Sequence, residues 1–378
     1  MSRRIVSVIG TRPNYMKISP IAALLARHDD FEHTLVHTGQ HYDASMSQIF
    51  FEQLGLGAPD HLLNVGSGTH GAQTARVMER LEPMLIELQP DIVLVPGDVN
   101  STMAASLVAC KLGQRIGHVE AGLRSFDRTM PEEINRIVAD SVADLLFTHS
   151  PEALPNLLAE GAPEESIFAV GNTMIDTLVA MLPRIDEARA PARLGLTAGD
   201  YLLVTLHRPA LTDGPKLAEA VRELRAVAQQ LPVVFPVHPR TRSRIDAEGL
   251  DTTGIKLLDP LGYIEFMSLM CSAVGVLTDS GGVQEETSYL GIPCFTLRDN
   301  TERPVTVEFG TNVLLGLAPA GIASVIDLLG ARGEREVAAI PGWDGHAAQR
   351  VVDVLASDEL PSRVELTAAR RPPLPESG

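Results

Sequence analysis

Apolar and polar residues alternate along this chain in a pattern that predicts buried strands separated by amphipathic helices. The apolar run at residues 5–9 ends at a Gly-Thr-Arg-Pro turn, and apolar residues then recur at helical spacing. Similar runs predict strands at 34–37, 91–98, 115–119, 145–148 and 167–170, with helices at 46–54, 72–88 and 103–112 and others starting near Pro131 and Pro151. Strands that alternate with helices require a parallel sheet covered on both faces.

The same alternation continues after residue 172. A helix is predicted at 175–182, which Pro183 kinks or ends, and strands follow at 201–206, 233–237, 255–258, 273–278, 294–297 and 313–315. A last amphipathic helix is predicted within 344–358, and the tail at 361–378 is expected to be loose. The fold class is therefore α/β, with two doubly wound Rossmann-like domains at 1–172 and 173–343 that face a central cleft.

Length and composition narrow the function without identifying it. The 378 residues suffice for two domains, and 48 acidic against 31 basic residues give a net charge of −17, which disfavours nucleic acid and anionic membranes as partners. No apolar run reaches membrane-spanning length and no signal-peptide core follows Met1, so a cytoplasmic protein is expected. The three cysteines lack metal-ligand spacing and are expected to be buried filler; neither a metal site nor a cofactor is predicted.

One stretch, residues 273–286, combines a buried strand with a glycine pair and a helix start. Ser280, Gly281 and Gly282 would leave the first N–H groups of the helix pointing outward, where the positive end of the helix dipole suits a phosphate. Taken alone, the same residues fit a simple strand-to-helix turn with Ser280 as its cap. The neighbouring motifs favour the phosphate site.

Other polar residues also stand where predicted strands end. Arg12 and Lys17 follow the first strand, Asp98 and Glu120 follow later ones, and His207 and Ser280 lie in the second half. Because ligands of open α/β sheets bind at the carboxyl ends of the strands, the cleft between the two domains is the expected site. Two of the candidate carboxylates also have a purely structural explanation. Asp98 could cap a helix, and Glu132 could pair with Arg136 four residues later.

Six motifs, taken together and in order, resemble the non-hydrolysing UDP-N-acetylglucosamine 2-epimerases. They are Gly10-Thr-Arg-Pro13 with Lys17, Pro96-Gly-Asp98, His118-Val-Glu-Ala-Gly-Leu-Arg124, Pro131-Glu-Glu133 with Asn135-Arg136, Leu206-His-Arg208, and Thr278-Asp-Ser-Gly-Gly-Val-Gln-Glu-Glu286 with Thr301-Glu-Arg-Pro304. The resemblance runs from residue 5 to about residue 355. It implies a glycosyltransferase-B-type architecture, a terminal helix at 344–358 that returns to the first domain, a UDP-sugar substrate and a homodimer.

The resemblance also implies a role for each candidate residue. The catalytic residues would be Asp98, Glu120, Glu132 and His207, with His207 contacting the nucleotide or the leaving phosphate. The residues that bind substrate would be Arg12, Lys17, Arg136, Phe266, Ser280, Gly281, Gly282, Glu286 and Arg303. Among these, Ser280 to Gly282 would hold the diphosphate with Arg12 and Arg303, Glu286 the ribose, and Phe266 would line the uracil pocket.

The chemistry of inversion at C2 explains why several carboxylates are needed. The C2 hydrogen of an N-acetylhexosamine is not next to a carbonyl, so removing it first would leave an unstabilised carbanion. Loosening the C1–O bond to UDP acidifies that hydrogen and allows elimination to a glycal, after which UDP adds back. Removing a proton from one face and delivering one to the other takes at least two acid/base groups, and the sequence does not assign a face to each.

Several alternatives stay open at this point. The chain could act on a related UDP-sugar, hydrolyse its substrate to the free sugar, or be a glycosyltransferase of the same architecture. A UDP-sugar sensor without turnover is a fourth possibility, against which Asp98, Glu120 and Glu132 argue.

Departures from the family pattern affect the substrate and its regulation. Asn14 stands where many relatives have a glutamate, and Pro209 follows His207-Arg208. Gln40 and His41 match the start of a second, activating UDP-sugar site that bacterial relatives have, but Asp43 and Thr69 replace a glutamine and an arginine there. A carboxylate gained and a cation lost beside a diphosphate predict weak or absent substrate activation.

Overall fold

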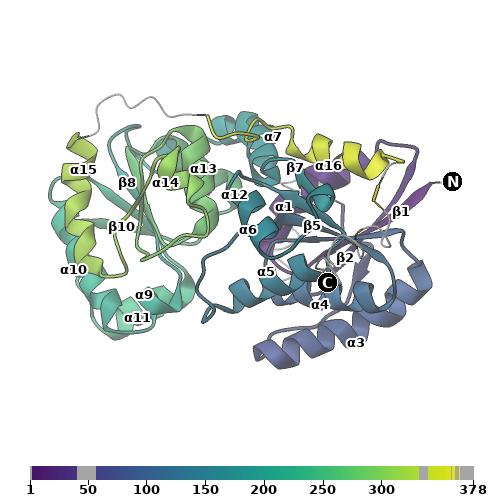
Figure 1. Ribbon diagram of the computed structural model, residues 1–378. Coiled ribbons are helices and arrows are strands. Elements are labelled where there is room, and N and C mark those ends of the chain that lie inside the picture. The colour runs from purple at the N-terminus through teal and green to yellow at the C-terminus, as the bar shows by residue number, and fades with distance from the viewer. Residues whose placement is uncertain (1, 41–56, 332–338, 359, 362–365, 367–378) are drawn as a thin grey trace, which may run out of the picture. The chain divides into compact units, whose positions relative to one another are not determined.

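The computed structural model describes residues 2–40, 57–331, 339–358, 360–361 and 366, and these divide into two compact α/β units. The first unit comprises Met1–Val179 with Pro341–Gly378, and the second comprises Ala180–Ile340. Each unit has a sheet and a hydrophobic core of its own (Figure 1).

The described part of the first unit contains a sheet in which every neighbouring pair of strands is parallel. The strand order is β3-β2-β1-β4-β5-β6-β7. The bounds are β1 Arg3–Ile9, β2 Phe31–His37, β3 His61–Leu62, β4 Ile92–Pro96, β5 Arg115–Ala121, β6 Leu145–Thr148 and β7 Ile167–Ala169. This order starts in the middle and grows outward in both directions, so the order reverses between β1 and β4, where doubly wound sheets bind ligands.

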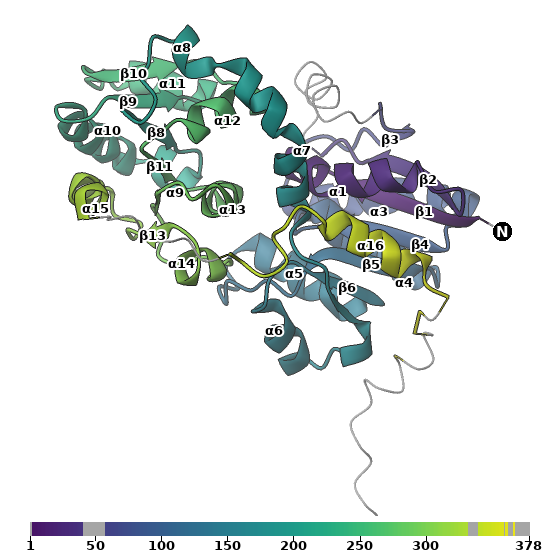
Figure 2. The same ribbon diagram turned by 90° about the horizontal axis from the view of Figure 1, so that it is seen from above.

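Helices cover both faces of this sheet because its strands are apolar on both sides. Val6 and Val8 of β1 pack with Val77 and Leu81 of α3 in one buried core, whereas Ile5 and Ile9 lie in the alternate positions of the strand. The helices are α1 Arg12–Leu25, α3 His70–Leu88, α4 Asn100–Lys111, α5 Pro131–Val142, α6 Ala153–Ala159, η1 Glu164–Ser166, α7 Thr173–Ala188 and α16 Ala347–Ala356. Although far apart in sequence, α16 and α1 lie side by side (Figure 2).

The second unit repeats this arrangement with a parallel sheet of order β10-β9-β8-β11-β12-β13. Its strands are β8 Leu202–Thr205, β9 Val233–Pro236, β10 Ile255–Leu258, β11 Gly275–Thr278, β12 Cys294–Thr296 and β13 Asn312–Leu314. Its helices are α8 Ala190–Arg193, α9 Pro209–Thr212, α10 Pro215–Ala228, α11 Pro239–Ala247, α12 Tyr263–Cys271, α13 Gly281–Leu290, α14 Val305–Glu308, η2 Pro319–Ser324 and α15 Val325–Ala331.

The predicted alternation of strands and helices is confirmed, with differences at particular elements. α7 continues through Pro183 to Ala188, so of the two predicted outcomes at this proline, a kink or an end, the end is excluded. The two units divide within α7, after Val179, whereas the expected boundary followed residue 172. The short strand β3 was not predicted. The predicted helix at 46–54, His41 and Asp43, and most of the tail at 361–378 lie outside the described residues.

Candidate active site

Lys17 of α1 and Glu120 of β5 form a buried ion pair in the first unit. Lys17 Nζ lies 2.6 Å from Glu120 Oε2, and the two side chains are 5% and 4% exposed. Glu120 has a left-handed backbone, with φ of +73°, where β5 shifts register against β6 between Val119 and Ala121. A left-handed glutamate costs about 1–3 kcal/mol, and such strain gathers at functional sites.

Asp98 follows the end of β4 and binds the buried Arg136 of α5 through a charged hydrogen bond. It does not cap the next helix, because Val99 occupies the N-cap position of α4. The preceding Gly97 has φ of +64°, and a Cβ there would lie 2.8 Å from Lys17 Nζ. Glycine therefore lets the Asp98 turn approach the Lys17–Glu120 pair closely.

The two carboxylates in the first turn of α5 have different surroundings. Glu132 is exposed, whereas Glu133 is 1% exposed and accepts hydrogen bonds from the N–H groups of Ser125 and Phe126, both at 2.9 Å. Burial alone would raise the pKa of Glu133, but these bonds and Arg136 Nη2, 2.8 Å away, lower it. Glu133 therefore fixes the loop before α5 as an ionised group, and Arg136 joins it to Asp98.

The first turn of α1 carries Arg12 and Asn14. Arg12 is exposed at the start of the helix. Asn14 is buried, accepts from the N–H groups of Gly10 and Thr11 at 3.0 and 3.1 Å, and donates to the carbonyl of Pro96 at 3.0 Å. An ionised glutamate could not make the last bond, because it has no proton to donate. The amide at residue 14 therefore ties the end of β1 to the end of β4.

In the second unit, the predicted phosphate site is the N-terminus of α13. Ser280 is at the N-cap position, but its hydroxyl makes no capping bond, so the simple capping alternative does not describe this turn. A Cβ on Gly281 would lie 2.8 Å from Arg303 Nη1. Glycine leaves room here for a guanidinium that lies against the backbone of the first turn.

Arg303 is held by two buried carboxylates. Its Nε lies 2.9 Å from Glu285 Oε1 and its Nη1 lies 2.6 Å from Glu302 Oε1. Glu302 also pairs with Arg298 at 2.7 Å. These two cations and two carboxylates fix the Arg303 guanidinium beside the start of α13.

His207 lies on the loop after β8 and pairs with Asp279, which follows β11. The distance from His207 Nδ1 to Asp279 Oδ1 is 2.8 Å, and Asp279 Oδ2 accepts from the backbone N–H groups of His207 and Arg208 at 2.9 and 2.8 Å. Burial would raise the pKa of Asp279, but these bonds lower it. Asp279 belongs to the Thr278–Glu286 motif, but its role could not be predicted from the sequence, because only folding brings it to His207.

The remaining predicted binding residues lie on α12 and α13. Glu286 is 5% exposed, and its Oε1 accepts a hydrogen bond from the hydroxyl of Tyr263 at 3.0 Å. Phe266 is half-buried on α12. Phe266 therefore lies on α12, and Glu286 lies on α13, the helix that begins directly after Ser280.

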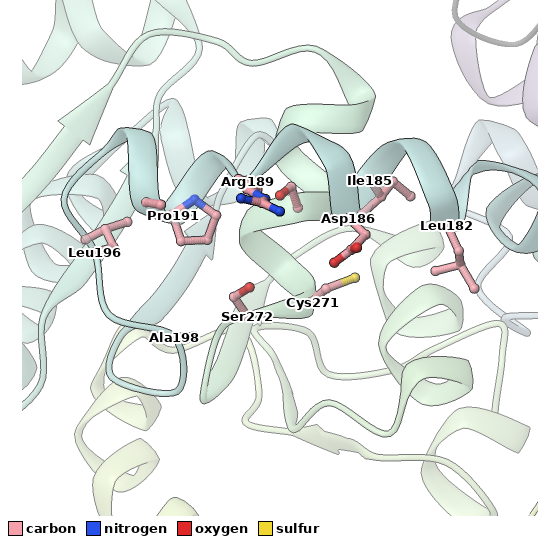
Figure 3. A pocket seen from close by; sticks show the side chains of 11 residues that line it. Leu182, Ile185, Asp186, Arg189, Pro191, Leu196, Ala198, Cys271 and Ser272 are labelled. Atoms are coloured by element: carbon pink, nitrogen blue, oxygen red, sulfur yellow. The ribbon is translucent and has the colours of Figure 1, made fainter.

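A cavity of about 540 Å³ lies within the second unit, between the end of α7, α8 and the end of α12 (Figure 3). Its walls include Asp186, Arg189 and Cys271, and none of the predicted binding residues lines it. The expectation that the cysteines are buried filler is wrong for Cys271, which is exposed at the last residue of α12, and Cys110 is only half-buried. Although Cys271 is exposed, the protein atoms around its thiol disfavour the charged form and, with the nearby Glu286 carboxylate, raise the pKa of Cys271 to about 11, so it is a poor nucleophile at neutral pH.

Metal-binding clusters and membrane-spanning helices are both absent from the described residues. No group of His, Cys, Asp and Glu side chains in that part of the chain is arranged to hold a metal ion. None of its helices combines the length and the apolar character that crossing a bilayer needs.

Comparison with known proteins identifies the family. The sequence profile of the UDP-N-acetylglucosamine 2-epimerase family matches residues 23–356. The enzyme of that name from Methanococcus maripaludis is 39% identical over 365 residues, which cover 94% of this chain and 98% of the relative. A UDP-2,3-diacetamido-2,3-dideoxy-D-glucuronate 2-epimerase from Pseudomonas aeruginosa is 43% identical over 322 residues, or 83% and 89% of the two chains.

Solved structures of UDP-GlcNAc 2-epimerases have the same fold as this chain. The Methanocaldococcus jannaschii UDP-GlcNAc 2-epimerase in complex with UDP-GlcNAc and UDP superimposes with a TM-score of 0.86 at 40% identity, covering 93% of this chain and 99% of that one. The Neisseria meningitidis enzyme bound to UDP-GlcNAc also gives 0.86, at 29% identity. The fold is of the glycosyltransferase-B type, as the motifs imply. This chain belongs to the UDP-N-acetylglucosamine 2-epimerase family.

Proposed function

We propose that this protein interconverts UDP-N-acetylglucosamine and UDP-N-acetylmannosamine without releasing the sugar. The observation that carries the proposal is the group of ionisable side chains at the carboxyl ends of β4 and β5. Glu120 is buried against Lys17 in a left-handed conformation, and the Asp98 turn lies against the same lysine. Such a cluster of strained, charged groups on a doubly wound sheet supports acid/base chemistry at this place.

The first unit would carry out the proton transfers. Asp98, Glu120 and Glu132 supply three carboxylates, of which one removes the C2 proton as UDP departs and another protonates C2 from the opposite face. Lys17 compensates the charge of Glu120, so that a buried carboxylate remains available. This route needs neither a metal ion nor a nicotinamide, because the departing UDP takes up the negative charge.

The second unit would hold the nucleotide. The Ser280 turn, the first-turn N–H groups of Gly281 and Gly282 and the guanidinium of Arg303 suit a diphosphate, which gains charge as the C1–O bond breaks. The N–H of Ser280 itself is donated to Thr278 Oγ1 at 3.0 Å. Glu286 would accept hydrogen bonds from the ribose hydroxyls, and Phe266 would line the uracil pocket. His207, oriented by Asp279, would contact the leaving phosphate, and Arg12 would assist in holding the diphosphate.

The relatives leave a second candidate for the sugar. The Pseudomonas aeruginosa relative is named for UDP-2,3-diacetamido-2,3-dideoxy-D-glucuronate, and its identity to this chain, 43%, is no lower than that of the UDP-N-acetylglucosamine enzymes compared above. Both sugars would undergo the same inversion at C2. We further propose that the protein is cytoplasmic and that it forms a homodimer. Light scattering of the purified protein tests the homodimer.

Proton NMR in heavy water tests the proposed function. With UDP-N-acetylglucosamine alone, we expect deuterium at C2 and the appearance of the manno product at equilibrium. Release of UDP in step with free sugar would instead show a hydrolysing enzyme, and unchanged C2 stereochemistry would point to a transferase or a sensor. Inversion of only the diacetamido-glucuronate substrate would establish the second candidate.

A further inference from the structure

His118 of β5 is buried between the two turns that carry Asp98 and Glu120. Its side chain is fully buried, with Nε2 2.8 Å from the carbonyl oxygen of Gly97 and Nδ1 2.6 Å from Asp140 Oδ1. Gly97 immediately precedes Asp98 in the chain. The imidazole therefore links the Asp98 turn to α5.

Asp140 extends this link to the Glu120 turn. Its Oδ2 accepts from the backbone N–H of Gly122 at 3.1 Å and lies 2.8 Å from Arg124 Nη2. Gly122 is two residues beyond Glu120. One buried His118–Asp140 pair thus contacts the backbone next to both Asp98 and Glu120.

The contacts of the ring define its protonation state. A carbonyl oxygen only accepts hydrogen bonds, so Nε2 must carry a proton. Burial would raise the pKa of Asp140, but His118 and Arg124 lower it, so this carboxylate is ionised and also only accepts. Both ring nitrogens then donate, which is the hydrogen-bond pattern of an imidazolium.

The charges that face His118 allow this cation to be buried. Asp140 comes from α5 and Arg124 from the loop after β5, and Glu160 at the end of α6 binds Arg124 through two hydrogen bonds of 2.7 and 2.6 Å. Lys17, beside Gly97, is paired with Glu120. The two cations His118 and Arg124 are therefore matched by two carboxylates.

We propose that His118, as an imidazolium paired with Asp140, is a positioning residue that fixes the Asp98 and Glu120 turns for proton transfer at C2. The proposal rests on the proposed function, because it concerns the geometry of that reaction. It does not place His118 in contact with substrate. Loss of such support shifts reacting groups by fractions of an ångström, which lowers turnover more than binding.

The first test needs no activity. In the intact protein with ¹⁵N-labelled histidine at pH 7, His118 should show two protonated ring nitrogens, and its signals should vanish in His118→Gln. His33 is the internal comparison, since burial lowers its pKa to about 4 and it should show one protonated nitrogen. A single protonated nitrogen on His118 would overturn the proposal.

The second test measures the two kinetic constants. In His118→Gln and Asp140→Asn, kcat should fall about 10- to 100-fold while KM and the dissociation constant for UDP change less than about threefold. His33→Gln, which alters a histidine of β2 bonded to Ser7 Oγ, should leave both constants unchanged. A kcat within twofold of wild type in both variants, or an equal loss of UDP binding, would contradict a positioning role. If the wild-type protein fails to epimerise, the proposed function fails, while the NMR result still decides the state of His118.

Discussion

At the scale of single residues, two residues next to the candidate site have a left-handed backbone conformation. Glu120 is buried and paired with Lys17, whereas Phe126 has φ of +59° and is 78% exposed. Phe126 remains in this conformation because its N–H is bound by the buried Glu133. The left-handed backbone at Glu120 directs a carboxylate to Lys17. The left-handed backbone at Phe126 leaves an aromatic ring mostly exposed, so the ring makes little packing that could offset the strain.

Phe126→Asn should therefore stabilise the first unit. Asparagine tolerates left-handed backbone and keeps the N–H that Glu133 binds, so we expect a gain of about 0.5–1 kcal/mol in the free energy of unfolding. The single tryptophan, Trp343, reports on this unit, because it is buried there and donates to the carbonyl of His149 at 2.9 Å. Urea unfolding followed by Trp343 fluorescence measures the change. A loss of stability would show that the exposed ring makes contacts that matter.

The pKa values of two histidines of β2 predict how the free energy of unfolding depends on pH. Burial lowers the pKa of both His33 and His37 from 6.5 to about 4. Between these values the unfolded chain binds more protons than the folded one, so stability is fully present above about pH 6.5 and is lost as the pH falls toward 4. Each histidine contributes at most about 3 kcal/mol to this loss.

His33→Gln should flatten that dependence. The unfolding free energy of the variant, measured through Trp343 between pH 7 and 4, should fall less steeply than that of wild type. His28→Gln alters an exposed histidine of the same unit and is the control. An unchanged slope in His33→Gln would mean that this histidine titrates normally in the folded protein.

At the scale of secondary structure, α5 organises the candidate carboxylates. Pro131 starts the helix, which puts Glu132 in its exposed first turn. Glu133, Arg136 and Asp140 follow at spacings of three and four, so they share the buried face. Arg136 reaches Asp98 and Asp140 reaches the turn after Glu120. One helix thus contributes a candidate carboxylate and supports the two others.

Removing Arg136 from the buried face of α5 should destabilise the protein. In Arg136→Met the buried Glu133 loses its cation, and we expect the free energy of unfolding to fall by about 3–5 kcal/mol. The double variant Glu133→Gln with Arg136→Met should lose less than the sum of the single changes, by about 1 kcal/mol or more. Arg128→Met, an exposed arginine just before the helix, is the matched control. Additive effects in the Trp343 unfolding curves would show that the pair is not coupled.

At the scale of the whole molecule, the two units are expected to separate chemistry from nucleotide binding. Asp98→Asn and Glu132→Gln should lower turnover by about a hundredfold or more while the dissociation constant for UDP is kept. Arg303→Ala should weaken UDP binding about tenfold or more, because a charged partner of the diphosphate is removed. Calorimetry with UDP and NMR turnover measure the two effects. Full activity in Glu120→Gln would remove that carboxylate from the proposed mechanism.

Substrate activation should be weak or absent. Thr69 is exposed at the N-cap of α3, where activated relatives would have an arginine, and Asp43 adds a carboxylate in a segment outside the described residues. The initial rate should follow a hyperbola in UDP-N-acetylglucosamine concentration. A sigmoidal curve, or stimulation of the reverse reaction by traces of UDP-N-acetylglucosamine, would contradict this.

The sequence by itself determined the class of fold, the order of its elements and the motifs of the family. Apolar runs and glycine turns are local signals, so β6 and β10 lie where they were predicted and α5 begins at Pro131. At Pro183 the local signal left a kink or an end open, and α7 continues through this residue to Ala188.

Only the tertiary structure decided which charges meet. His118 and Asp140, Lys17 and Glu120, and His207 and Asp279 are distant in sequence and lie within 2.8 Å of each other in the folded chain. The separation of the exposed Glu132 from the buried Glu133 was likewise invisible in two adjacent glutamates. Electrostatic interactions depend on distance and burial, and a residue pattern specifies neither until the strands have taken their register.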